Sequence, residues 1–471
     1  MASIKKYLAN QRLLFCIIFI VGIFFVLPTS ASAADRYWVG GTGNWDASTT
    51  THWGSASGVA DNASVPTSAD NVIFDTASNA TAYTVTVTAT ANCANITFAN
   101  PASGALTFAG SSTLNVYGNF TISSTITRTF TGSLVFLATS TGKTITFNGV
   151  SMASATAFSG VGGGWTLQDT WNNTGSISLN NGSLDTNNKS ISTNGGNFSM
   201  SGSSTRSLTL GSSTLTVGSF TATTTTNLTF NAGTSVIVWG GPNGTFAGGG
   251  LTYNELRLNL SASPTITGAN TFATLTRTGT NQKTDELVLA ADQVITGTLT
   301  INGDSAVNRV LVRSNTVGTP RTLTAGTVSV TNADFRDITG AGAGSWNLSA
   351  VTGGSGDAGG NSGITFTTGS NQHWVNTSGG NWSTAANWTS RVPLPQDDVF
   401  FDCAFTTSRT VTADMPRAGK SIDWTGATWT TSLTYSISTQ QTLYGSLILV
   451  DNLTMGGSAF NFVFNGRSSY L

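Results

Sequence analysis

The sequence contains few side chains that carry charge or perform acid–base and metal chemistry. Only 9% of its 471 residues are charged, against about 25% in an average soluble domain. The chain has only two histidines, His52 and His373. This number gives little basis for a histidine metal site or a Ser-His-Asp triad. No phosphate-binding loop ending in Gly-Lys-Ser/Thr occurs. The sequence therefore predicts no catalytic residue, no metal site and no cofactor.

A surplus of basic residues is also absent. Lys5, Lys6 and Arg12 lie in the N-terminal segment 1–33, and without them 17 basic residues face 21 acidic ones, a net charge of −4. This balance predicts no nucleic-acid partner and no anionic membrane surface as partner.

Cysteine is equally scarce. Outside the N-terminal segment the chain has only Cys93 and Cys403, at positions that do not correspond in the internal repeat described below. Two cysteines cannot form the disulfide framework of a chain this long. We expect two small buried thiols, with one long-range disulfide as the alternative.

The N-terminal segment 1–33 is typical of an export signal. The three basic residues precede an apolar run at 13–27, and Ala31-Ser32-Ala33 has the composition of a cleavage site. The run is shorter than the ~20 residues that a membrane-spanning helix needs. We expect cleavage before Ala34 and export of the rest, with a retained membrane anchor as the alternative.

Helical spacing of apolar residues appears nowhere after residue 34. Instead, residues 84–368 repeat short tetrads of alternating polar and apolar residues, such as Asn95-Ile96-Thr97-Phe98, the pattern of strands with one buried face. Sandwiches and barrels close after about ten strands, whereas these signals continue far longer without a linker. The sequence therefore predicts an all-β fold, a right-handed parallel β-helix with about three short strands per coil. The 54 glycines suit its tight turns.

One motif occurs twice and organises the chain. Trp38-Val39-Gly40-Gly41-Thr42-Gly43-Asn44-Trp45 recurs at 374–382, and each copy is followed by another tryptophan, a proline and an acidic pair. Later segments match at a nearly constant offset, as in Ile96 with Ile422 and Tyr117 with Tyr444. A register held this long predicts a tandem duplication.

The duplication divides the chain. Residues 1–33 are the signal peptide, residues 34–370 a first β-helical unit with a Trp-rich start at 37–75, and residues 371–471 the start of a second copy that is cut short. A stack that stops part-way exposes uncapped backbone groups. We therefore expect a truncated reading frame, or a product cut from something longer.

The motif tryptophans are the candidate binding residues. Aromatic faces stack on sugar rings, so one interpretation is carbohydrate binding. The other is that these rings, which bury about 150–250 Å² each, close the open end of a stack. Their place at the start of each unit favours the second. The six residues are Trp38, Trp45, Trp53, Trp374, Trp382 and Trp388.

Acidic residues near the motifs provide too few oxygens for calcium, which takes six to eight, so turn formation is the preferred role. These residues are Asp70, Asp75, Asp397, Asp398 and Asp402.

The best polar cluster is Asp334, Arg336 and Asp337, but in a strand the first two face one side and the third the other. We expect these charges not to converge. The remaining acidic candidates are Asp285, Glu286, Asp304 and Asp357.

At the doubled motif the chain resembles a loosely defined family of exported bacterial β-helical surface proteins, including autotransporter-like adhesins. Their units begin with Trp-Gly-Gly…Asn-Trp…Pro…Asp, as at Trp38…Asn44-Trp45…Pro66…Asp70. The second copy departs at Asn376-Thr377, which replaces the first Gly-Gly, and the first has His52 where the second has Asn387. The resemblance implies surface display, adhesion or a structural stalk, and it transfers no catalytic residue.

We therefore expect a secreted or cell-surface, non-catalytic protein of adhesion or structural support. Its expected partners are surface glycans or a neighbouring or host cell surface, and it meets the membrane only through the signal peptide during export. The alternatives are a polysaccharide-degrading β-helix hydrolase or lyase, and a carbohydrate-binding module that uses the tryptophans. A groove gathering three carboxylates from adjacent coils would favour the enzyme.

Overall fold

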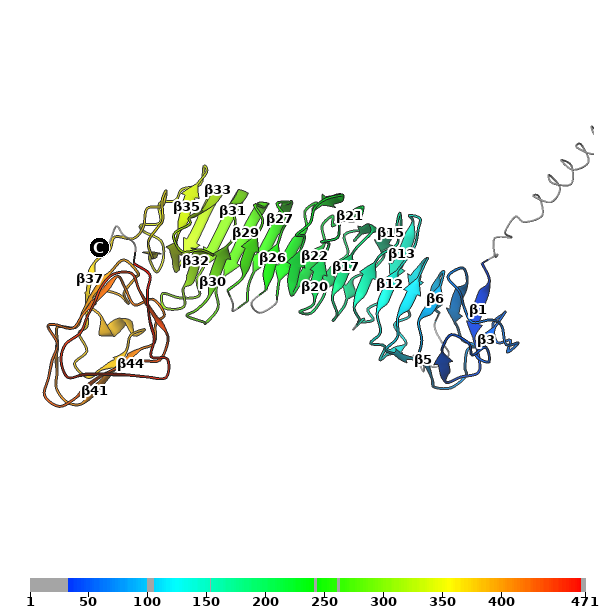
Figure 1. The fold of residues 1–471 in the computed structure, drawn as a ribbon, viewed down its shortest axis with the longest axis horizontal. Coiled ribbons are helices and arrows are strands. Elements are labelled where there is room, and N and C mark those ends of the chain that lie inside the picture. Colours follow the sequence, from blue (N-terminus) through cyan, green and yellow to red (C-terminus); the bar gives the residue numbers. More distant parts are fainter. Residues whose placement is uncertain (1–32, 100–105, 153, 241–243, 261–262, 467–471) are drawn as a thin grey trace, which may run out of the picture.

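The computed structural model describes residues 33–99, 106–152, 154–240, 244–260 and 263–466. Residues 1–32, which hold nearly all of the predicted export signal, lie outside this range. The described chain is a β-solenoid of stacked coils, with a single short 3₁₀ helix, η2 (Ala385–Asn387), among the residues described. Within these ranges no helix combines the length and apolar character needed to cross a membrane. The all-β parallel β-helix prediction is confirmed (Figure 1).

Successive coils place equivalent residues directly above one another. Val72 pairs with Ile96 and Ile96 pairs with Phe120, both in parallel register. Because inward-facing residues stack on inward-facing residues, the two-residue period of each strand produces one continuous apolar core.

Two parallel sheets run along most of the first unit. Sheet A contains, in chain order, β1 (Asp35–Trp38), β3 (Trp53–Gly54), β4 (Asn71–Phe74), β7 (Ile96–Phe98), β10 (Phe120–Thr121), β13 (Lys143–Thr146), β15 (Gly164–Leu167), β18 (Gly182–Asp185), β21 (Arg206–Thr209) and β24 (Leu228–Asn231). Sheet C contains β6 (Ala91–Cys93), β9 (Leu114–Val116), β12 (Leu134–Phe136), β14 (Thr156–Phe158), β17 (Ile177–Leu179), β20 (Asn197–Ser199), β23 (Ser219–Thr221), β26 (Thr245–Ala247), β28 (Thr265–Thr267), β30 (Glu286–Leu289), β32 (Val310–Ser314), β34 (Ala333–Arg336) and β36 (Ser355–Asp357).

The third side of the coil is shared by two shorter sheets. Sheet B contains β2 (Gly43–Trp45), β5 (Tyr83–Val87), β8 (Leu106–Gly110) and β11 (Thr127–Arg128). Sheet D contains β16 (Trp171–Asn172), β19 (Ile191–Ser192), β22 (Thr214–Val217), β25 (Val236–Trp239), β27 (Thr252–Leu258), β29 (Thr271–Thr278), β31 (Gln293–Asn302), β33 (Arg321–Thr331) and β35 (Ile338–Ala341).

The coil changes shape along the rod. Sheet A ends at β24, and from β27 onward the strands of sheet D lengthen, up to eleven residues in β33. The β29–β31 and β31–β33 pairs carry register shifts in mid-strand, where a strand can bend. One long bent strand thus replaces two short ones. Three strands per coil therefore describes the N-terminal part of the unit, and two describe its C-terminal part.

The second unit repeats the same plan from its own tryptophan motif. Its sheets contain β37 (Asn371–His373), β39 (Asp398–Phe400), β42 (Ser421–Asp423) and β46 (Leu447–Ile448); β38 (Gly380–Asn381), β41 (Arg409–Ala413), β44 (Leu433–Ile437) and β47 (Leu453–Gly456); β40 (Ala404–Phe405) and β43 (Thr428–Trp429); and β45 (Gln441–Leu443) and β48 (Phe462–Phe464). A separate apolar cluster fills it. The repeat architecture is thereby confirmed.

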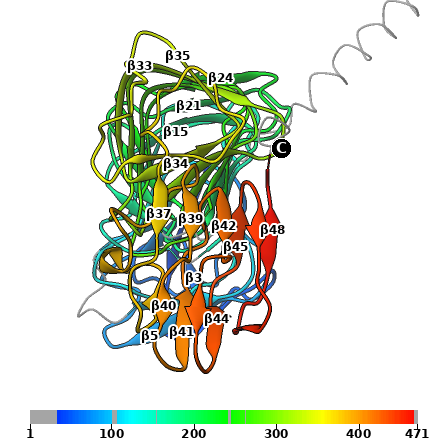
Figure 2. The ribbon, with the colours of Figure 1, turned by 90° about the vertical axis from the view of Figure 1, so that its left-hand side faces the viewer.

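The second stack lies across the end of the first. Figure 1 shows the first unit as a rod along the long axis, with the coils of the second unit seen end-on at one end. In Figure 2 β37, β39 and β42 lie side by side, in the order in which they pair. The chain is therefore an elbow of two solenoids, not one continuous rod.

Candidate functional site

The tryptophan motif closes the beginning of each unit. In the first unit β3 folds back antiparallel on β1, and Trp38 pairs with Trp53 at the outer edge of sheet A. In the second unit Trp374 and Trp388 form the same antiparallel bridge. An edge strand so covered cannot accept a further strand. This arrangement explains why the second unit starts a new stack.

The six tryptophans are buried, none more than 4% exposed. Within each copy their rings pack edge to face, with centroids 5.1 Å apart for Trp38–Trp53 and for Trp374–Trp388. No ring face is left for a sugar to stack on. The carbohydrate-binding interpretation of these six residues therefore lacks the exposed surface it requires, whereas the end-closing interpretation agrees with their burial.

Of the acidic residues beside the motifs, Asp70 and Asp397 form turns, whereas Asp398 lies in β39 and Asp402 pairs with His373 at 2.7 Å. Asp70 Oδ2 accepts the Thr67 amide at 2.9 Å, and Asp397 Oδ2 accepts the Leu394 amide at 2.8 Å, each just after a proline. Burial raises the pKa of Asp70, but the Thr67 hydroxyl and amide outweigh it, so the pKa is lowered. Among the described residues no group of three His, Cys, Asp or Glu side chains is placed to hold a metal ion.

The two cysteines are separate thiols. Cys93 is buried in the first unit, Cys403 is half-buried in the second, and neither forms a disulfide. Burial raises the pKa of both thiols. This agrees with the preferred expectation for Cys93.

The remaining acidic candidates do not meet in one groove. Asp285 is buried against Arg277, with Arg277 Nη2 3.5 Å from Asp285 Oδ1. Asp304 lies in an exposed turn, and Asp357 accepts the Asn361 side-chain amide at 2.7 Å. These carboxylates come from different coils and point to different partners.

The junction between the two units contains a buried cluster of charges. Asp334 on β34 faces outward from the first unit, and Arg309 Nε donates to its Oδ1 at 2.8 Å. Arg417 of the second unit donates from Nε to Asp334 Oδ2 at 2.5 Å. Asp334 is 0% exposed, Arg309 3% and Arg417 4%. One carboxylate therefore joins two guanidinium groups from two units.

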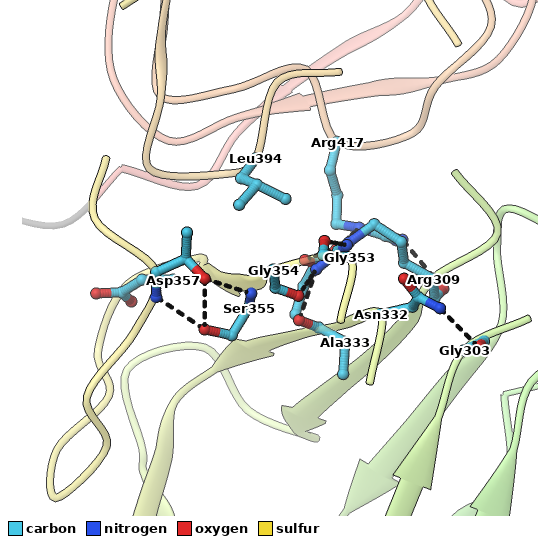
Figure 3. A network of polar contacts seen from close by, with 12 residues as sticks. Gly303, Arg309, Asn332, Ala333, Gly353, Gly354, Ser355, Asp357, Leu394 and Arg417 are labelled. Carbon is cyan, nitrogen blue, oxygen red and sulfur yellow. Dashed lines mark hydrogen bonds and ion pairs between the residues drawn. The ribbon is translucent and has the colours of Figure 1, made fainter. Parts of the chain in front are cut away.

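The cluster is hydrogen-bonded on all sides. Arg309 also donates to the carbonyls of Ala333, Gly353 and Gly354, between 2.6 and 2.9 Å (Figure 3). Burial lowers the pKa of Arg309, and Asp334 opposes that effect. A buried charge is tolerated only when it is paired and bonded in this way.

The second unit also covers the last strand of the first. The Gln396 side chain accepts the Asp357 amide at 2.9 Å and donates to the Ser355 and Thr367 carbonyls. In Figure 3 Leu394 reaches from the second unit toward Gly354 and Ser355. A side-chain amide here replaces the next strand, so the edge of β36 is closed.

A third junction contact joins Lys283 to Asp414 at 2.7 Å, and Ser383 also donates to Asp414. Burial raises the pKa of Asp414, but the hydrogen bonds from Lys283 and Ser383 outweigh it, so the pKa is lowered. Two ion pairs therefore join the units, Lys283 with Asp414 and Asp334 with Arg417.

Beside this cluster the two units enclose a cleft of about 360 Å³. The first unit contributes Glu286, Arg313 and Arg336 from the outer face of sheet C, and the second contributes Arg417 and Tyr444. Arg313 donates to Glu286 through Nε and Nη2, at 3.0 and 2.8 Å. Hydroxyl and amide side chains complete the wall: Thr284, Thr439, Gln440, Thr442 and Asn465.

Tyr444 is the unusual member of this cleft. It follows β45 on the outer face of the second unit, yet it is only 3% exposed because the first unit covers it. Its hydroxyl has no hydrogen-bond partner among the residues that the structure describes. Burial raises the pKa of Tyr444 to about 12.

The prediction that the charges of Asp334, Arg336 and Asp337 do not converge holds for Asp334 only. Asp334 turns away from Asp337 and pairs with Arg309 and Arg417. Arg336 Nε, however, lies 3.9 Å from Asp337 Oδ2, because Asp337 leaves the strand with φ of +56°. The alternation argument holds only for extended backbone.

The sequence did not predict that Arg309, Arg417 and Tyr444 are residues of a site. A signal was available for one of them. At the offset that relates Ile96 to Ile422, Arg417 takes the place of Ala91, which is small and buried. An arginine that replaces a small apolar residue in one copy only indicates a role specific to that copy.

Comparison with known proteins gives no relative for this chain: no protein-family model, no curated protein and no solved structure matches it.

Proposed function

We propose that the chain is an exported, surface-displayed or extracellular protein that acts in adhesion or as a structural stalk. The main support is the continuous core of the first unit, which extends from Trp38 to Leu348. Sheet C alone has thirteen strands, and at about 4.8 Å per strand the rod is about 60 Å long. A stack of this kind keeps its two ends apart through its continuous core and does not depend on loops for its length.

Two further features support this proposal. Only 9% of the residues of the chain are charged, and the N-terminal sequence has the form of an export signal. The elbow places the second unit at the end of the rod that lies far from β1 (Figure 1). A display rod with a terminal module fits this layout.

The test is localisation together with cell attachment. Antibodies raised against residues 34–466 should label intact cells of the producing organism, and external protease should remove the label. Deleting the gene should reduce attachment to glycan-coated or cellular surfaces. A protein confined to the cytoplasm would refute display. Release of reducing ends from a panel of polysaccharides by the purified chain would refute the non-catalytic part.

A further inference from the structure

We infer that the cleft between the two units binds a carboxylate-bearing sugar, such as a hexuronic acid residue. The inference goes beyond display and adhesion, because it names a ligand chemistry for one site and does not depend on where the protein is located. It rests on the enclosed volume, the excess of guanidinium groups and the buried Tyr444 hydroxyl.

The charge balance favours a ligand with one negative charge. Three guanidinium groups line the cleft, from Arg313, Arg336 and Arg417. A fourth, from Arg309, shares the Asp334 carboxylate with Arg417. Three carboxylates face them, from Glu286, Asp334 and Asp337. One positive charge is therefore in excess. Guanidinium groups bind planar carboxylates with paired hydrogen bonds, so a single carboxylate fits this surplus.

The rest of the wall suits a sugar ring. Tyr444 lines the cleft, and its hydroxyl is buried with no hydrogen-bond partner among the described residues. Leaving such a group unbonded costs free energy, which a ligand hydroxyl would recover. Thr439, Gln440 and Asn465 add donors and acceptors, and Leu311 adds an apolar face. The volume of about 360 Å³ lies within the roughly 300–1,000 Å³ of small-molecule sites.

The site exists only where the two units meet. Tyr117 occupies the position in the first unit that corresponds to Tyr444, and it is half-exposed on the outer wall with no second unit over it. The duplication thus supplied the tyrosine, and the elbow buried it beside the arginines.

The experiment is titration calorimetry of the full chain with D-glucuronate and D-galacturonate, against D-glucose and inorganic phosphate. We expect saturable binding of a uronate and much weaker binding of glucose and phosphate. Tyr444→Phe should raise the Kd about three- to tenfold, the effect of one hydrogen bond. The matched variant Tyr117→Phe should leave the Kd unchanged. Because the Tyr444 hydroxyl bonds nothing in the described chain, this variant should keep the fold.

A second pair of variants tests the charge. Arg313→Gln should weaken uronate binding about tenfold or more, since charge-assisted bonds are the stronger ones. Arg257→Gln removes a similar ion pair, with Glu255, away from the cleft and should change nothing. Tighter binding of an oligouronate would identify a polysaccharide as the source, and equal binding would identify the free sugar. Absence of uronate saturation, equal binding of glucose or phosphate, or an unchanged Kd in Tyr444→Phe would overturn the inference.

Discussion

Replacing Asp334 with asparagine isolates the charge on which the junction depends. The carboxylate is fully buried and lies 2.8 Å from Arg309 Nε and 2.5 Å from Arg417 Nε. In Asp334→Asn two buried guanidinium groups would face each other without a counter-charge. Breaking a buried pair in this way costs about 3–5 kcal/mol. We expect the junction to open by a free-energy change of that order.

The effect has to be measured locally, because solenoids do not unfold in one step. Hydrogen exchange of the amides in β34 and β36 reports on the junction. A loss of about 3 kcal/mol corresponds to exchange that is on the order of 100-fold faster. Exchange in the distant β9 should not change. Small-angle scattering should show a wider range of shapes as the second unit separates from the first.

Two controls make the reasoning refutable. Asp304→Asn alters an exposed turn carboxylate and should leave exchange in β34 unchanged. The triple variant with Asp334→Leu, Arg309→Met and Arg417→Met replaces the charges with apolar volume and should recover much of the lost stability. If Asp334→Asn exchanged at the wild-type rate in β34 and β36, the charge cluster would not be what holds the units together.

Three further outcomes follow from other sites. The pKa of Asp414 in the folded protein is lowered from its ordinary value of 3.8. The ionised carboxylate therefore stabilises the junction fully above pH 3.8, and this stabilisation is lost as the pH falls through the lower folded pKa. Hydrogen exchange at the junction should accelerate over that acid range in the wild type, and Asp414→Asn should abolish this pH dependence. Gly110→Ala should destabilise the first unit by several kcal/mol, because its Cβ would collide with the Val87 carbonyl oxygen at a φ of +116°. In Gly142→Ala the Cβ would meet nothing within 4 Å, so this control should cost only about 1–2 kcal/mol in chemical denaturation. Iodoacetamide should modify half-buried Cys403 in the folded protein and buried Cys93 only after unfolding; equal rates would contradict the burial of Cys93.

The local pattern was sufficient to predict the stack. Alternating tetrads such as Asn95-Ile96-Thr97-Phe98 predict a strand with one buried face, and the structure places Ile96 and Phe98 in the core. The same is true of the duplication, because two copies of one sequence form the same coils. Burial of Trp38 and Trp374 also follows, since large rings at the start of a stack have a core to cover.

The contacts at the junction between the two units could not be predicted from the local sequence pattern. Which coil of the first unit meets Arg417 depends on how the second stack lies across the first, and no local pattern encodes that orientation. The pairing of Asp334 with Arg417 joins residues 83 positions apart in the sequence. The fold of each unit could be predicted, because strand period and turn residues act over a few positions. The cleft could not, because its walls come from different units that only the folded chain brings together.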